Sequence, residues 1–132
     1  MIVLDTHVLI WWVDSPQKLS KKVKKAIEEW KSKESGILVS SISALEICRL
    51  VKEGKLELIN SADVWLEKIE SLPFIKFIPV DNRIAIASVN LPDFYHKDPA
   101  DRIIIATAMS YGAVLVTSDR RMLTYLPVQT LW

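Results

Sequence analysis

The chain has 132 residues, half of them hydrophobic and a quarter charged, and its 17 Lys and Arg against 16 Asp and Glu leave a net charge of +1. This composition is typical of one globular domain, expected to span residues 1–132, and it excludes a general electrostatic attraction to nucleic acid. No apolar run approaches the ~20 residues of a membrane span, and the N-terminus lacks the basic region of a signal peptide. The single cysteine, Cys48, excludes an intrachain disulfide and is expected to be buried, so we expect a cytoplasmic protein.

The first half of the chain alternates short apolar runs with amphipathic segments. A strand is expected at residues 2–4, a short apolar helix at 8–13, and a helix from Ser20 to about residue 33. A second strand at 37–39 leads to a helix capped by Ser41 or Ser43 and ended by Gly54, and a further helix runs from Asn60 or Ser61 to near Pro73. The helix that begins at Ser20 carries a basic side that is expected to face solvent, formed by Lys21, Lys22, Lys24 and Lys25.

The second half continues the same alternation. A third strand is expected at 75–80, followed by a helix at 84–90 that Asp81 caps. Asp98 followed by Pro99 predicts the start of a buried helix that ends at Gly112, and strands follow at 114–116 and, at the edge, 128–131. The pattern predicts an α/β fold, a three-layer α/β/α sandwich with a central, mostly parallel sheet of four to five strands.

Acidic residues follow several of the predicted strands. Asp5 comes directly after the first strand, Glu46 lies in the first turns of the helix after the second, and Asp119 follows the fourth. Because parallel strands present their carboxyl ends at one edge, we expect these acids to converge there. Asp98 and Asp101 lie at the start of the last long helix, where acids also serve simply to stabilise the helix start. They reach the same edge only if the preceding loop crosses back over the carboxyl edge of the sheet.

Carboxylates gathered in one crevice repel each other and require a counter-charge. The sequence has no cluster of histidines and cysteines, so an all-oxygen site for Mg²⁺ is expected, with Mn²⁺ as a substitute. Such an ion activates water and stabilises charge on a phosphoryl group. No phosphate-binding glycine motif is present, which argues against nucleotide triphosphatases and dinucleotide enzymes.

The chain resembles the PIN domain (PilT N-terminus) nucleases, and in particular the VapC toxins of prokaryotic toxin–antitoxin pairs. The resemblance rests on segments in a fixed order: LDTHVLIWW at 4–12, VSSISALEI at 39–47, EGKLEL at 53–58, HKDPADRIIIATA at 96–108, LVTSD at 115–119 and the final Trp132. It implies a PIN-like fold and a metal-dependent endoribonuclease that acts as the toxin of a type II (VapBC) pair. It also implies that the start of the last long helix lies at the acidic edge.

The resemblance assigns roles to the acids, Asp5, Glu46, Asp101 and Asp119 matching the family's acidic quartet. Asp5 and Asp101 would bind the principal Mg²⁺, Glu46 would bind it or orient the attacking water, and Asp119 would complete the site or hold a second ion. Asp101 is preferred as the ligand and Asp98 as the helix cap, with the opposite assignment left open. Thr6 and Thr117 are expected either to support the acids or only to cap local structure. The mechanism needs neither histidine, His7 nor His96.

The same resemblance implies an RNA substrate, a homodimer and an antitoxin partner. Basic side chains around the crevice are expected to contact RNA, namely Lys97, Arg102, Arg120 and Arg121. The apolar segments 47–59 and 64–72 are the expected protein-binding surfaces.

Three other functions stay open on the sequence. One is a PIN-type RNA-processing nuclease that is not a toxin, and another is a Mg²⁺-binding phosphoacceptor module. The third is a binding module without catalytic activity.

Overall fold

The fold is built on a central sheet of five parallel strands, described in a computed structural model of residues 1–132. The strands are ordered β3-β2-β1-β4-β5, so the N-terminal strand β1 lies in the middle and pairs with both β2 and β4. This sheet confirms the predicted fold class, and its strand order reverses beside β1, where doubly wound folds place their sites. The strands are β1 (Ile2–Leu4), β2 (Ile37–Ser40), β3 (Ile75–Ile78), β4 (Val114–Val116) and β5 (Thr130–Leu131).

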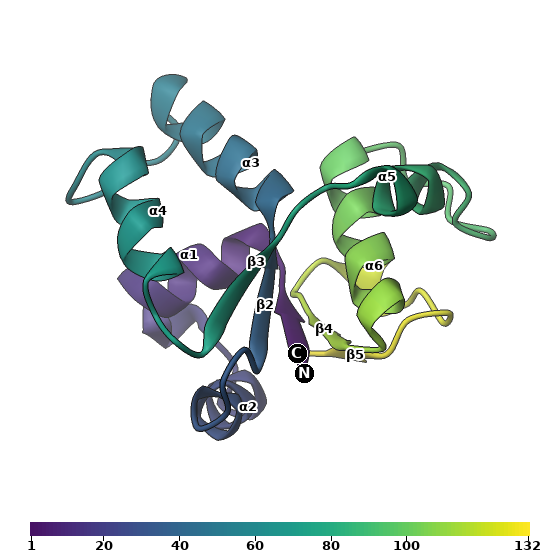
Figure 1. Ribbon diagram of the computed structural model, residues 1–132, viewed down its shortest axis with the longest axis horizontal. Coiled ribbons are helices and arrows are strands. Elements are labelled where there is room, and N and C mark those ends of the chain that lie inside the picture. Colours follow the sequence, from purple (N-terminus) through teal and green to yellow (C-terminus); the bar gives the residue numbers. More distant parts are fainter.

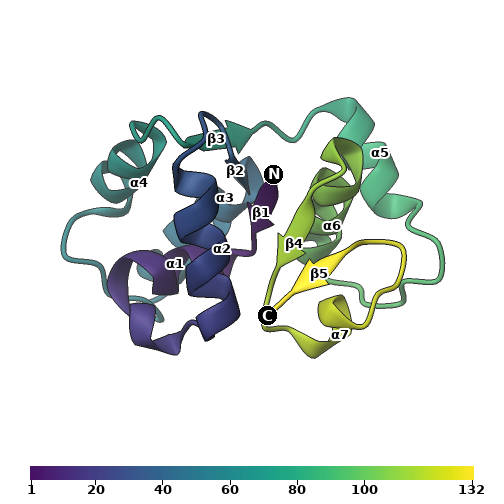
Figure 2. The same ribbon diagram turned by 90° about the horizontal axis from the view of Figure 1, so that it is seen from below.

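Two helical layers cover the sheet (Figure 1). One layer contains α1 (Thr6–Asp14), α2 (Lys21–Lys31), α3 (Ser41–Lys52) and α4 (Ala62–Glu70). The other contains α5 (Asn82–Val89), α6 (Pro99–Tyr111) and the short α7 (Arg120–Leu123). The segment between β3 and α5 runs from the edge of the sheet to the α5–α7 layer, as Figures 1 and 2 both show.

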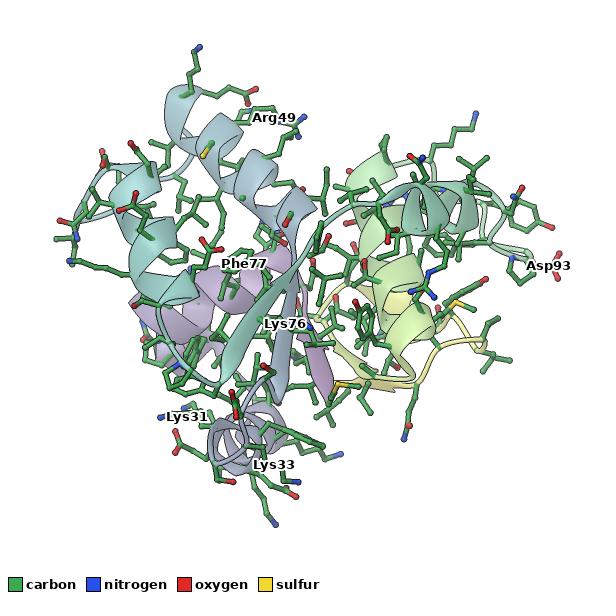
Figure 3. All side chains as sticks on the ribbon, in the orientation of Figure 1. Lys31, Lys33, Arg49, Lys76, Phe77 and Asp93 are labelled. Atoms are coloured by element: carbon green, nitrogen blue, oxygen red, sulfur yellow. The ribbon has the colours of Figure 1, made fainter.

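The alternation of side chains along the strands divides the core between these layers. Ile2 and Leu4 pack with the α1–α4 layer, whereas Val3 between them packs with the α5–α7 layer. On the edge strand β3 the exposed Lys76 and the partly buried Phe77 point to opposite sides (Figure 3). Burial on both faces explains why the central strands read as unbroken apolar runs.

Several helix starts differ from the prediction by a few residues. Helix α1 begins at Thr6 rather than residue 8, because the Asp5 carboxylate caps it. The cap of α3 is Ser40, which accepts from the Ile42 N–H, and not Ser41 or Ser43. Asp81 and Asp98 cap α5 and α6 as predicted. The sequence did not predict α7 or the 3₁₀ turn η1 (Pro16–Lys18), which are too short to show a helical repeat.

Surface exposure corrects two further expectations. Cys48 is exposed, because α3 buries only Ser43 and Ile47 and Cys48 is turned away from that buried side. Among the expected protein-binding segments, Ile47, Trp65 and Ile69 are buried in the core. The lysines at the start of α2 are exposed as predicted. No helix combines the length and the apolar character needed to cross a membrane.

Candidate active site

Asp5 lies at the carboxyl end of β1 and is only 6% exposed. Its Oδ1 accepts a 2.7 Å hydrogen bond from the Thr6 N–H, and its Oδ2 accepts one of 2.8 Å from the Thr117 hydroxyl. Thr117 directly follows β4, the strand paired with β1, which is why residues so far apart in sequence meet. Both carboxylate oxygens are therefore held in fixed positions.

Glu46 reaches the same place from the second turn of α3. The Thr6 hydroxyl donates to its Oε1 at 2.5 Å and also lies 2.8 Å from the hydroxyl of the buried Ser43. Ser43 and Glu46 are three residues apart on the helix, so both side chains face α1. The first residue of α1 thus connects the carboxylates that follow β1 and β2.

Asp98 and Asp101 lie at the start of α6. The Oδ1 of Asp98 accepts from the N–H groups of Ala100 and Asp101, which accounts for its role as the cap. The Oδ2 of Asp101 is 2.6 Å from Nε2 of His96. One ligand atom from each of His96, Asp98 and Asp101 lies within 4.8 Å of the others, so these residues form a candidate cation-binding group.

Asp119 has a different environment from the other acids. It caps α7 through its Oδ1, which accepts from the Arg121 N–H, and its Oδ2 accepts from the Arg121 guanidinium at 3.3 Å. Partial burial on its own would raise the pKa of Asp119, but these bonds and the positive charge of Arg121 lower it. Asp119 therefore stays ionised with a cation already beside it.

The negative charge of Asp101 acts on the acids of the other elements. Burial raises the pKa of Asp5 to about 6. The hydrogen bond from Thr117 lowers this pKa, and the negative charge of Asp101 raises it. Burial also raises the pKa of Glu46, with further contributions from the charges of Asp101 and Asp98. The pKa of Asp101 is raised first by its own burial and then by Asp98 and Asp119. Asp101 is connected through His96 and Arg121 to Asp119, which lies beyond the end of β4, so the start of α6 lies at the carboxyl edge of the sheet.

This group of carboxylates fits a hard divalent cation. Neither Asp5 nor Glu46 forms an ion pair with a basic side chain, although both are buried or half-buried. Buried carboxylates are ordinarily paired or coordinate a metal. Oxygen donors from Asp5, Glu46 and Asp101 suit Mg²⁺ or Mn²⁺, which accept carboxylate ligands readily.

The structure decides some of the alternatives that the sequence left open. Thr6 and Thr117 do donate their hydroxyls to the acids. The guanidinium of Arg102, which was expected to contact RNA, donates to backbone carbonyls. These carbonyls, at 2.6–3.1 Å, are those of Ser88, Val89, Phe94 and His96. Arg120 is exposed, and Lys97 and Arg121 border a hollow beside the acids.

Sequence reasoning set His96 aside and missed Ser43 as parts of the site. His96 lies two residues before the cap Asp98, a position from which a side chain reaches the first turn of the helix, and this spacing was the available signal. No comparable signal existed for Ser43, because its contact depends on how α1 and α3 pack.

Comparison with known families identifies the class of protein. The PIN domain family model matches residues 2–125, nearly the whole chain, so the protein belongs to the PIN domain family. It is 34% identical over 121 residues to Ribonuclease VapC22 from Mycobacterium tuberculosis, with 92% of this chain and 88% of that protein covered. This relationship places it with the VapC-type members of the family and excludes the phosphoacceptor module.

Solved structures share the fold. VapBC2 from Rickettsia felis, bound to a DNA fragment from its promoter, matches with a TM-score of 0.73 at 16% identity, covering 99% of this chain and 98% of that one. A toxin–antitoxin complex from Klebsiella pneumoniae matches with a TM-score of 0.64 at 22% identity, covering 97% and 95%. At these identities the likeness concerns the fold.

Proposed function

We propose that the protein is a metal-dependent endoribonuclease of the VapC type, the toxin of a type II toxin–antitoxin pair. The observation that carries this proposal is the pair of Asp5 and Glu46, which Thr6 joins at the carboxyl edge of the sheet and neither of which has a basic partner. The relative named as a ribonuclease supports RNA as the substrate.

In this proposal Asp5, Glu46 and Asp101 hold Mg²⁺. When bound, the ion would stabilise negative charge on the phosphoryl group and lower the pKa of a water molecule. Thr117 and Thr6 hold the carboxylates of Asp5 and Glu46 in the required orientation. His96 does the same for Asp101. Asp119 completes the negative edge while its charge is balanced by Arg121, and Asp98 acts chiefly as the cap of α6.

The proposed partners are an antitoxin and a second copy of the chain. The matched structures include toxin–antitoxin complexes. Exposed apolar side chains remain available for such contacts on and beside α3 and α4, namely Leu45, Ile59 and Val64. Size-exclusion chromatography with light scattering is the measurement that checks the dimer.

The central test is cleavage of total cellular RNA by the purified protein, with mapping of new 5′ ends. We expect cuts with Mg²⁺ and none with EDTA, and Asp5→Asn removes them because the buried ligand loses its charge. The matched control is Asp63→Asn, which makes the same chemical change at an exposed position of α4. Cleavage by Asp5→Asn at the wild-type rate would contradict the proposal.

A second measurement separates a toxin from an RNA-processing nuclease. Brief induction of the wild-type chain is expected to stop growth, and co-expression of a small protein encoded directly upstream restores it. Growth that continues while RNA is cleaved identifies the processing enzyme instead.

A further inference from the structure

A hollow of about 520 Å³ lies beside the acidic cluster and has no role in the proposal so far. It is lined by Phe94, Tyr95, His96, Lys97, Arg121 and Thr124, and its size is within the ~300–1,000 Å³ of pockets that bind small organic ligands. None of these lining residues is acidic, in contrast to the neighbouring edge of the sheet.

Two of the lining side chains also contact the acidic cluster. The imidazole of His96 is 2.6 Å from Asp101, and its other nitrogen is 3.0 Å from the Arg121 guanidinium, which in turn bonds to Asp119. The hollow and the acidic cluster therefore share a wall. A phosphodiester at the acids would have its neighbouring nucleotide at the hollow.

The chemistry of the lining suits an unpaired nucleotide. Tyr95 is 83% exposed, on the loop between α5 and α6, and its hydroxyl donates to Asp93, which lies at the outer rim of the molecule (Figure 3). An exposed aromatic ring with cations beside it is the arrangement that stacks a base and contacts its phosphate. Lys97 and Arg121 supply the cations.

Beneath Tyr95 the hollow has a rigid base. Phe94 is buried against the ring of Tyr125 at 4.8 Å and against His96 at 5.9 Å, and Arg102 binds its carbonyl oxygen. The loop that carries Tyr95 is thus fixed on both sides of that residue. A base stacking on Tyr95 would meet a surface that is already formed.

The geometry points to this hollow as a subsite for the nucleotide of single-stranded RNA that adjoins the cleaved phosphodiester, with Tyr95 stacking its base and Lys97 contacting its phosphate. The inference rests on the proposed ribonuclease function for its substrate class. The hollow is then the part of the surface that selects and positions the RNA.

The test measures binding separately from cleavage. An eight-nucleotide RNA with one 2-aminopurine, moved through each position, is titrated in EDTA, where no cleavage is expected. Tyr95→Ala is expected to weaken binding roughly tenfold and to remove the quenching of 2-aminopurine at one position. Tyr95→Phe, which keeps the ring, should retain both within about twofold.

Lys97→Ala provides an independent readout of the phosphate contact. A plot of log affinity against log salt concentration has a negative slope, and its magnitude should decrease by about 0.7, the value for one phosphate on a single strand. Lys22→Ala on α2 is the control, since that lysine is also exposed, and it should leave the slope unchanged.

The outcomes separate this subsite from the nuclease proposal. RNA cleavage with Mg²⁺, together with unchanged affinity and quenching in Tyr95→Ala, would overturn the subsite and leave the nuclease intact. Binding and quenching that depend on Tyr95, in a protein that cuts no RNA, would support base stacking on Tyr95 and reject the nuclease, and with it the position of the subsite beside a cleaved phosphodiester. A wild-type chain that does not bind the RNA would overturn the subsite.

Discussion

Threonine hydroxyls hold two carboxylates of the site, those of Asp5 and Glu46, in place. Thr117 donates to Asp5, and Thr6 donates to Glu46. Each bond lowers the pKa of its acid and so opposes the effect of burial. The hydroxyls therefore keep the carboxylates both oriented and more readily ionised, as a cation ligand requires.

Thr117→Val tests this support at the scale of one residue. Valine keeps the shape but leaves Oδ2 of Asp5 without its donor, so the pKa of Asp5 should rise further and the affinity for Mg²⁺ should fall about 10–100-fold. Thermal unfolding titrated with Mg²⁺ measures the change. Thr117→Ser, which keeps the hydroxyl, is the control, and equal affinities in the valine and serine variants would show that the bond is not needed.

Helix α6 allows the cap and ligand roles of Asp98 to be distinguished. Asp98→Ala should cost about 1 kcal/mol of unfolding free energy, the usual effect of losing an N-cap. Asp81→Ala removes the equivalent cap from α5, at a position where no site residue is affected. If Asp98 is only a cap, the two variants lose similar stability and both keep RNA cleavage. A selective loss of cleavage in Asp98→Ala would instead assign it as a ligand.

The loop between α5 and α6 depends on Arg102. Its guanidinium donates to carbonyls at the end of α5 and along the loop up to His96, and it lies 5.6 Å from the Phe94 ring. Lysine cannot reproduce this set of bonds. We expect Arg102→Lys to lower the unfolding free energy by about 2–4 kcal/mol. Arg120→Lys, at an exposed site, should change it little, and urea denaturation compares the two.

The strands and the acids that follow them were predictable, because an apolar run that ends in a carboxylate leaves few alternatives once strands alternate with helices. This reasoning predicts that Asp5 and Glu46 both lie at the carboxyl edge of the sheet. The contacts of His96 and Arg102 were not predictable, since both depend on the path of residues 90–97, which has no repeating pattern. Sequence spacing also could not show that Asp119 would be paired with Arg121 two residues later.

Stability of the whole molecule is expected to depend on pH and on metal. The pKa of Asp5 is raised from 3.8 to about 6 on folding, so the folded state holds its proton more tightly, and this stabilising contribution is lost as pH rises through that range. In EDTA the wild type should lose roughly 2 kcal/mol of unfolding free energy relative to Asp5→Asn between pH 4 and 7.

Added Mg²⁺ should reverse this loss at pH 7 in the wild type, because a ligand that binds only the folded state stabilises it. Asp5→Asn should respond much less. Parallel pH profiles of the two proteins in EDTA would show instead that Asp5 titrates as it does in the unfolded chain.

The central position of β1 determines when the site is complete during synthesis. Strand β1 leaves the ribosome before its partner β4, and the hydroxyl that holds Asp5 belongs to Thr117, which directly follows β4. A nascent chain has no finished site until translation has passed that residue. Fragments that end before Thr117 should therefore be inactive, and the cell that produces the protein is exposed to its activity only after translation has passed that residue.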